Sequence, residues 1–330
     1  MAERIPFLEQ YGSPCSAQGT IETVTYNTQA YALERIYHQE HIPLQKRMFV
    51  YLPYQYDPTK KYPVLYLMHG GTDHEGYWFG EDPYQREDTV KYTPVGNITQ
   101  NLLDHMIFEK IIDPLIVVTP SFCEDVEAFQ KRPEYAAVYF QVVNYFWMEL
   151  KNDIMPYIQS HYATYAADET WASAQQAREH MAYAGCSQGS ITGLNSVMAH
   201  LLDAFSCIGS FSAGIIQHHW DGQELKLTLD TQKIGEVAGA VNQGSPIRFW
   251  YNGCGDHDQM YDTHRATYDA LISLCGGKLR GQDQENGNCV FALRPGGEHR
   301  YRDWIEDLYS CLRFFFGISG DCVPSDKKNE

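Results

Sequence analysis

Short apolar runs recur along the chain, separated by longer stretches in which apolar residues return with helical spacing. Runs that are apolar at consecutive positions are typical of strands buried on both faces of a parallel sheet. They occur at residues 64–68, 115–119, 181–184, 207–211, 247–251 and 290–293. The stretches between them predict helices at residues 97–108, 145–161, 190–202, 263–274 and 304–316. Because strand and helix alternate, the pattern predicts an α/β fold with a mostly parallel, doubly wound sheet and helices on both faces.

The N-terminal part of the chain shows a different pattern. Polar and apolar residues alternate there, which predicts antiparallel strands at residues 19–26, 33–37 and 47–52. No long polar, proline-rich or glycine-rich tract divides the rest, and a hydrophobic content of 44% is enough for one large core. We therefore expect a single domain at residues 19–317, an N-terminal extension at 1–18 and a C-terminal tail at 318–330.

The charge of the chain narrows its partners. The formal net charge is −17, so the surface repels phosphate backbones and anionic lipids, and we expect neither nucleic acid nor membrane as a partner. The sequence contains no run of 18 apolar residues, so no membrane-spanning helix is predicted. Metalloprotease, P-loop and dinucleotide-binding motifs are also missing from the sequence, so no metal and no cofactor are expected.

One glycine-rich turn carries a nucleophile motif. Residues 185–189 read Gly-Cys-Ser-Gln-Gly, a G-x-S-x-G pattern that follows a predicted strand and precedes a predicted helix. This order is typical of a nucleophile elbow, in which a sharp turn exposes the serine hydroxyl. The motif predicts Ser187 as the nucleophile and the Gln188 amide as one donor to the reacting oxygen.

Two further turns supply an acid and a base in the order that such a serine requires. Residues 252–258 follow a predicted strand and contain Asp256 and Asp258. Asp256 is the favoured orienting acid because glycines flank the turn around it, and Asp258 is the alternative. His299 lies in the glycine-rich turn 295–299, between a predicted strand and the last predicted helix, where a general base is expected.

The turn after the first parallel strand completes the predicted machinery. It reads His-Gly-Gly at residues 69–71, and a backbone N–H there is expected to be the second oxyanion donor. Gly71 is the favoured donor, with Gly70 and Thr72 as alternatives. His69 is interpreted as a structural group that holds this turn.

These motifs resemble carbohydrate esterase family 1, and more narrowly its feruloyl esterase and acetyl xylan esterase modules. The resemblance rests on residues 62–71, 76–79, 114–120, 185–190, 253–256 and 296–299. It implies an α/β-hydrolase fold with Ser187, Asp256 and His299 as the triad. The family commonly has methionine after the nucleophile, where this chain has Gln188, and this difference leaves the acyl preference open.

The resemblance implies a serine esterase that releases ferulic acid from feruloylated or acetylated plant polysaccharide through an acyl-enzyme. An apolar slot for the aromatic ring is expected from Trp78, Phe79 and Trp220. Acetyl xylan esterase, another small-acyl esterase, and a non-catalytic carbohydrate-binding relic are the alternatives. A mature, secreted protein is expected, with a cytoplasmic one as the alternative. If the protein is exported, a disulfide is possible among Cys275, Cys289, Cys311 and Cys322.

Overall fold

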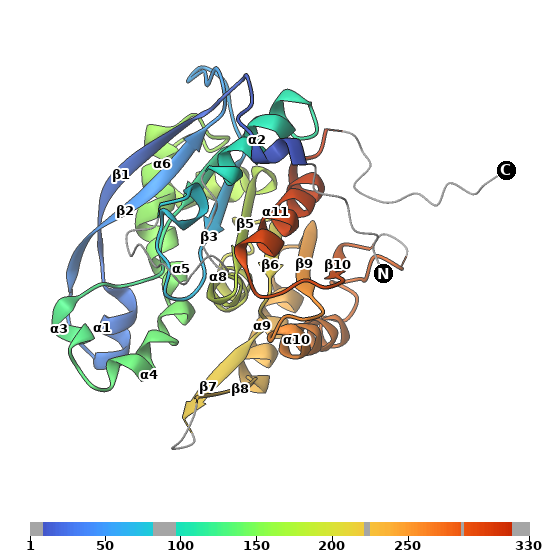
Figure 1. Ribbon diagram of the computed structural model, residues 1–330. Coiled ribbons are helices and arrows are strands. Elements are labelled where there is room, and N and C mark those ends of the chain that lie inside the picture. The colour runs from blue at the N-terminus through green and yellow to red at the C-terminus, as the bar shows by residue number, and fades with distance from the viewer. Residues whose placement is uncertain (1–8, 82–96, 221–224, 285–286, 319–330) are drawn as a thin grey trace.

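The computed structural model describes residues 9–81, 97–220, 225–284 and 287–318 (Figure 1). Within these residues an eight-stranded sheet forms the centre of the molecule. Across the sheet its strands are β1 (Thr20–Gln29), β2 (Pro43–Leu52), β4 (Ile116–Thr119), β3 (Val64–Met68), β5 (Met181–Cys186), β6 (Cys207–Phe211), β9 (Phe249–Gly255) and β10 (Cys289–Arg294). The strands from β4 to β10 are parallel, whereas β1 and β2 pair antiparallel and β2 meets β4 antiparallel. The predicted fold class, including the antiparallel N-terminal strands, is confirmed.

Helices cover both faces of this sheet, as predicted. On one face lie η1 (Glu9–Gly12), η2 (Tyr77–Phe79), α2 (Ile98–Phe108) and α11 (Tyr301–Phe316). The other face carries α5 (Phe146–Glu149), η4 (Leu150–Ile154), α6 (Met155–His161), α7 (Trp171–Gln176), α8 (Gln188–Thr192), η6 (Gly193–Met198), α9 (Thr231–Gln243) and α10 (Tyr261–Leu274). Shorter segments are α1 (Tyr31–Tyr37), α3 (Glu127–Gln130), α4 (Tyr135–Tyr139), η3 (Val142–Asn144) and η5 (Arg178–His180).

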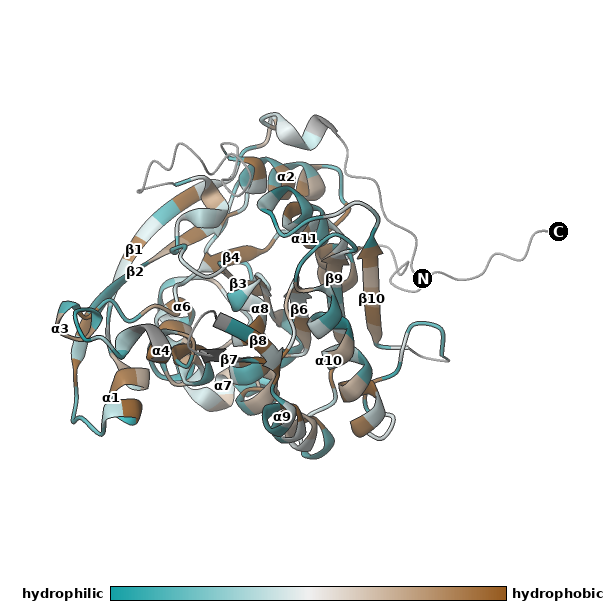
Figure 2. Ribbon diagram, turned by 60° about the horizontal axis from the view of Figure 1, so that its bottom comes forward, coloured by the Kyte–Doolittle hydropathy of each residue, from teal (hydrophilic) through white to brown (hydrophobic). Residues whose placement is uncertain are grey.

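Alternate side chains of each central strand enter opposite cores. In β3, Val64, Tyr66 and Met68 belong to one hydrophobic cluster, while Leu65 and Leu67 belong to the other. All five are buried, because a parallel strand covered by helices on both faces has no side exposed to water. In Figure 2 the edge strand β10 is mostly hydrophobic, whereas α9 carries hydrophilic residues on the surface it presents.

The prediction of a strand at residues 33–37 is wrong, because these residues lie in the helix α1. The apolar residues Leu33, Ile36 and Tyr37 fit helical spacing as well as alternation. A long-range contact favours the helix: the buried carboxylate of Glu124 accepts hydrogen bonds from the amides of Ala32 and Leu33 at 2.7 and 2.9 Å. A contact with a residue about ninety positions away is not visible in the local pattern.

Two inserted segments extend beyond the sheet and were not predicted. One is an antiparallel hairpin of β7 (Ile216–Trp220) and β8 (Leu225–Leu229), which projects from the body in Figure 1. The other is the short helical segment of α3 and α4, which lies at the same end of the molecule. Both contribute walls to the pocket described below.

Two further properties of the described residues concern membrane spans and disulfides. Among the described residues, no helix has the length and apolar character needed to cross a membrane. The eight cysteines within that part of the chain carry free thiols, so the possible disulfide among Cys275, Cys289 and Cys311 is not formed. Cys322 lies outside the described residues.

Candidate active site

Ser187 occupies a sharp turn between β5 and α8. Its φ of 52° and ψ of −120° lie in a region that residues other than glycine rarely adopt, so the backbone at this point is strained. Glycine is required on both sides of the turn: a Cβ at Gly185 would lie 2.6 Å from the carbonyl carbon of Gly189, and a Cβ at Gly189 would lie 2.4 Å from the carbonyl oxygen of His69. The turn therefore has the strand–serine–helix geometry of a nucleophile elbow.

His299 reaches this serine from the loop between β10 and α11. Its Nε2 lies 2.9 Å from the Oγ of Ser187, although the two residues are 112 positions apart in the chain. The imidazole also packs edge-on against Trp304. The structure thus brings together the nucleophile and base that the sequence predicts.

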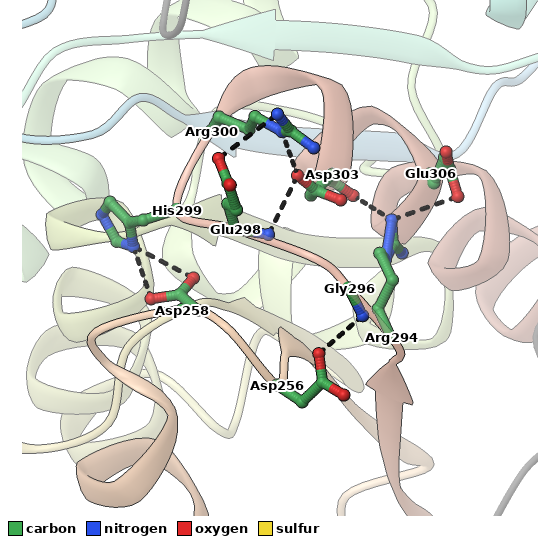
Figure 3. A network of polar contacts seen from close by, with 9 residues as sticks. All are labelled: Asp256, Asp258, Arg294, Gly296, Glu298, His299, Arg300, Asp303 and Glu306. Carbon is green, nitrogen blue, oxygen red and sulfur yellow. Dashed lines mark hydrogen bonds and ion pairs between the residues drawn. The ribbon is translucent and has the colours of Figure 1, made fainter.

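The acid beside His299 is Asp258, so the structure corrects the prediction of Asp256 (Figure 3). The Nδ1 of His299 lies 2.9 and 3.1 Å from the two carboxylate oxygens of Asp258. Asp256 is exposed, and its carboxylate accepts a hydrogen bond of 2.6 Å from the amide of Gly296. β9 continues to Gly255, beyond the predicted end at residue 251, so Asp256 begins the turn and Asp258 follows it.

Asp258 is held as a carboxylate by its neighbours. It is only 5% exposed, and burial alone would raise its pKa. The hydrogen bond and positive charge from His299, with further hydrogen bonds from the Met260 amide and the Ser212 side chain, outweigh burial and lower the pKa. Ser212 was not identified from the sequence, because only the pairing of β6 with β9 brings it beside the acid.

The turn after β3 lies directly against the elbow. A Cβ on Gly71 would lie 2.7 Å from the side-chain oxygen of Gln188, and a Cβ on Gly70 would lie 3.4 Å from the Cβ of Ser187. In the part of the chain that the structure describes, the amides of Gly71 and Gln188 donate no hydrogen bond to another residue. Both N–H groups are therefore free to bind an oxygen of a substrate.

His69 fixes this turn as a neutral imidazole. Its Nδ1 donates to the carbonyl of Gly70 at 2.7 Å, so its Nε2 accepts from the hydroxyl of Ser121 at 2.9 Å. Burial lowers its pKa to about 3. Because the C=O and N–H of a trans peptide point in opposite directions, holding the Gly70 carbonyl also fixes the direction of the Gly71 amide.

A pocket of about 620 Å³ opens beside Ser187 and His299. Its wall is largely apolar and comes from the segment around α4, from α8 and from the β7–β8 hairpin. The apolar lining residues are Pro133, Tyr135, Tyr139, Phe140, Ile191, Ile216, Leu227 and Met260. Gln130, Arg132 and Gln259 add polar groups to the wall.

Two of the three aromatic residues predicted for this pocket, Trp78 and Phe79, do not line it. Trp78 is fully buried, donates from its indole N–H to the Met68 carbonyl and packs against Tyr301 in the core. Phe79 is also buried, next to Phe49. Both belong to η2, whose side chains fill the core on the α11 face of the sheet. Trp220 is the last residue of β7, and its side chain lies outside the described part of the chain.

Metal ligands do not gather at this site or elsewhere among the described residues, where no group of three His, Cys, Asp or Glu side chains has a suitable arrangement. The groups that the site brings together are the serine hydroxyl, the imidazole of His299 and the two free amides.

An elbow serine on a mostly parallel sheet, with a histidine at its hydroxyl, defines the class of this protein: it is an α/β-hydrolase of the serine esterase type. More particularly, the chain belongs to the family described as putative esterase, whose sequence model matches residues 41–315. This match makes the protein an esterase.

Several known proteins are similar to this chain. A feruloyl esterase module from Clostridium thermocellum, solved in complex with sinapinate, is 26% identical with a TM-score of 0.71, and the match covers 96% of this chain and 94% of that one. A ferulic acid esterase of carbohydrate esterase family 1 from Anaeromyces mucronatus, solved with ferulic acid, has the same fold at 20% identity, with a TM-score of 0.63 and coverage of 93% and 95%.

A curated relative places the same domain in a longer protein. Endo-1,4-beta-xylanase Y of Acetivibrio thermocellus is 28% identical over 314 residues, which are 94% of this chain and 24% of the relative. The chain thus spans about a quarter of the length of that protein. Together with the solved structures, this match confirms the resemblance to carbohydrate esterase family 1.

Proposed function

We propose that this protein hydrolyses feruloyl and related hydroxycinnamoyl esters on plant cell-wall polysaccharide, with Ser187, His299 and Asp258 as its catalytic triad. The observation that carries the proposal is a continuous chain of contacts from the buried Asp258 through His299 to the Ser187 hydroxyl. The serine end of this chain lies at a largely apolar pocket. Similarity to a feruloyl esterase module over nearly the whole chain supports the same acyl group.

The proposed reaction is a two-step acyl transfer. His299 Nε2 takes the proton of Ser187 as Oγ attacks the ester carbonyl, and Asp258 holds the opposite ring nitrogen as a donor and stabilises the imidazolium. The oxyanion accepts hydrogen bonds from the Gly71 and Gln188 amides. His299 then protonates the departing sugar oxygen. In the second step a water molecule attacks the acyl-enzyme while His299 takes its proton, and His299 returns that proton to Ser187 Oγ as the acid leaves.

The size and lining of the pocket favour a hydroxycinnamoyl group over an acetyl group. An acetyl group needs only a small space beside the serine, whereas about 620 Å³ is within the range that holds drug-sized aromatic ligands. Tyr135, Tyr139 and Phe140 offer aromatic surface on one wall, and Ile216 and Leu227 of the hairpin offer aliphatic surface from another part of the chain. We therefore place the aromatic ring of the acyl group between these two insertions.

The proposed polymeric substrate also concerns where the enzyme acts. Plant polysaccharide does not enter cells as intact chains, so we propose that the protein works outside the cell, as a secreted enzyme. Detection of the full-length protein in the culture medium of its host, with a cytoplasmic marker absent from that medium, tests this. Confinement to the cell fraction would contradict it.

The nucleophile is tested with purified protein and Ser187→Ala on methyl ferulate and on p-nitrophenyl acetate. We expect wild type to release ferulate and the variant to lose at least about 10⁴-fold in kcat, because removal of a triad nucleophile leaves only binding and the oxyanion donors. Equal rates for the two proteins would refute the serine mechanism. Hydrolysis of the acetate ester alone would keep the triad and make the protein an acetyl esterase.

The aromatic slot needs its own variant. Leu227 is 41% exposed at the pocket, and Leu274 is 52% exposed on α10 outside it, which makes the two leucines a matched pair. We expect Leu227→Ala to raise KM for methyl ferulate several-fold and to leave p-nitrophenyl acetate unaffected, because only the larger acyl group reaches the hairpin. Leu274→Ala should change neither. A change for acetate equal to that for ferulate would place the acyl group elsewhere.

A further inference from the structure

A second pocket lies at the opposite edge of the sheet from Ser187. It has a volume of about 560 Å³, comparable to the active-site pocket. Its lining includes Pro63, Pro114, His180 and Arg248, which lie just before the parallel strands β3, β4, β5 and β9. The amino ends of parallel strands meet at one edge and Ser187 follows the carboxyl end of β5, so the sheet separates the two pockets.

The charge of this second pocket is opposite in sign to that of the whole chain. Lys60, Lys61 and Arg248 line it together with Asp113 and Glu179. Glu179 pairs with Arg178, which lies outside the lining, at 2.6 Å, and with Arg248 of the lining at 3.9 Å. With both carboxylates counted, three cations against two anions still leave the lining with a net positive charge, on a protein whose formal net charge is −17. Such a local excess favours a ligand that carries a negative charge.

An aromatic surface stands next to these cations. The ring of Tyr165 stacks on that of His180, with centroids 3.4 Å apart and planes within 6°, and Tyr165 is 37% exposed. Burial first, and then the positive charges of Arg248 and Lys61, lower the pKa of His180, while the carboxylate of Glu179 opposes them. This stacking holds the tyrosine ring in place and leaves part of its surface to a ligand.

We propose that this pocket is a second saccharide site, which binds a uronic acid unit of an acidic oligosaccharide. Lys60 and Lys61, which are exposed at the pocket, bind the carboxylate. The exposed part of Tyr165 contacts the apolar face of a sugar ring, and Asp113 accepts hydrogen bonds from its hydroxyl groups. The saccharide part of the ligand rests on the proposed function, whereas the preference for an anion rests on the lining residues alone.

Binding at this edge would hold the enzyme on a charged polysaccharide while Ser187 acts on esters at the other edge. A second contact with the same polymer raises the local concentration of ester groups without changing the chemical step. The site therefore affects hydrolysis of the polymer and not of a small soluble ester.

The test uses full-length Ser187→Ala protein, which binds without turnover, in calorimetric titrations with three tetrasaccharides. These are xylotetraose, xylotetraose with one glucuronic acid branch, and the same branched compound with its carboxyl group reduced to an alcohol. We expect the acidic compound to bind about tenfold more tightly than the reduced one, which corresponds to one charge-assisted hydrogen bond. Equal affinity for the acidic and reduced compounds would overturn the proposal.

Matched variants locate the binding. Lys61→Gln removes one positive charge from the pocket, and Lys278→Gln removes one from an exposed position outside it. Lys61→Gln should lower affinity for the acidic compound about tenfold and Lys278→Gln should not, while Tyr165→Ala should weaken binding of both branched compounds. If Lys61→Gln and Lys278→Gln behave alike, the acidic sugar binds elsewhere and the proposal is wrong.

Failure of this site can be distinguished from failure of the proposed function. Methyl ferulate is too small to span the two pockets, so Lys61→Gln with Ser187 intact should hydrolyse it at the wild-type rate. Ferulate release without selective uronate binding would contradict only the second site. Selective uronate binding without ferulate release would contradict only the proposed reaction.

Discussion

The nucleophile turn and the acid turn follow the carboxyl ends of two parallel strands, β5 and β9, yet they are determined in different ways. Around Ser187 the geometry depends on adjacent residues: Gly185 and Gly189 let strand and helix close, and the strained backbone exposes the hydroxyl. Around Asp258 the geometry depends on where β9 ends and on a histidine 41 positions later. A local motif therefore predicts the first turn, whereas only tertiary structure selects the acid of the second.

The two aspartates of the second turn differ chiefly in their surroundings. Asp256 is exposed and holds the Gly296 amide, which supports the loop that carries His299. Asp258 is buried and faces the imidazole itself. The same residue type, two positions apart, thus supports the backbone of the loop in one case and the base in the other.

The different roles of the two aspartates are tested most directly by replacing each of them with asparagine. Asp258→Asn should lower kcat/KM on methyl ferulate by about 10³–10⁴, because the amide no longer holds the required tautomer or stabilises the imidazolium. Asp256→Asn should stay within a few-fold of wild type, because its side-chain oxygen still accepts from Gly296. Thermal unfolding of both variants serves as the control for folding. A larger loss for Asp256→Asn would restore the acid expected from the sequence.

A smaller effect is expected at the turn beside the nucleophile. His69→Ala releases the Gly70 carbonyl and so loosens the Gly71 amide. We expect kcat to fall about 10–100-fold with little change in KM, which is less than complete loss of one oxyanion donor. The pH dependence of kcat should not change, because burial keeps the pKa of His69 at about 3.

His69→Asn is the matched variant, since its amide nitrogen can donate to the Gly70 carbonyl in place of Nδ1. We expect it to recover most of the lost kcat. If the asparagine and alanine variants are equally slow while equally stable, His69 does not act through that carbonyl.

The smallest effect is on the pH dependence of the unfolding free energy. It concerns His264, a second buried histidine, which lies close to the acid turn. His264 lies beneath the acid turn, donates from Nε2 to the Asn252 side chain, and has its pKa lowered to about 3 by burial. Its Nδ1 has no hydrogen-bond partner among the residues that the structure describes. A histidine with a lowered pKa in the folded state takes up protons only on unfolding. Stability is therefore lost as pH falls from about 6.5 toward 3, by at most about 1.4 kcal/mol per pH unit.

His264→Gln keeps the donor to Asn252 and removes the titrating group. Between pH 7 and 5.5 we expect the variant to lose about 1 kcal/mol less unfolding free energy than wild type. Urea unfolding at the two pH values measures this difference. An identical loss in both proteins would show that His264 does not titrate on unfolding.

The sequence predicted those features that neighbouring residues determine. The central strands, the main helices, Ser187 and the loop position of His299 follow from apolar runs and glycine turns. The features that failed depend on contacts between distant residues. Glu124 stabilises α1 where alternation suggested a strand, and the extra length of β9 moves the acid to Asp258. Trp78 lies in the core because its ring packs against Tyr301 and its indole N–H donates to the Met68 carbonyl. Its position after a strand cannot indicate these contacts.

The pocket walls were also beyond local prediction. Tyr139 and Leu227 belong to two insertions that meet beside Ser187 only in three dimensions. Each insertion by itself has an ordinary mixture of apolar and polar residues. Acyl preference therefore depends on how the insertions pack, which explains why the motifs define an esterase before they define its substrate.

The free thiols offer a way to follow the opening of this molecule. Cys254, Cys275 and Cys289 belong to the core on one face of the sheet, and Cys186, Cys207 and Cys311 belong to the core on the other face. A buried thiol reacts with an alkylating reagent only after the surrounding structure opens. The order in which these cysteines are alkylated under native conditions would therefore report which layer of helices separates from the sheet first.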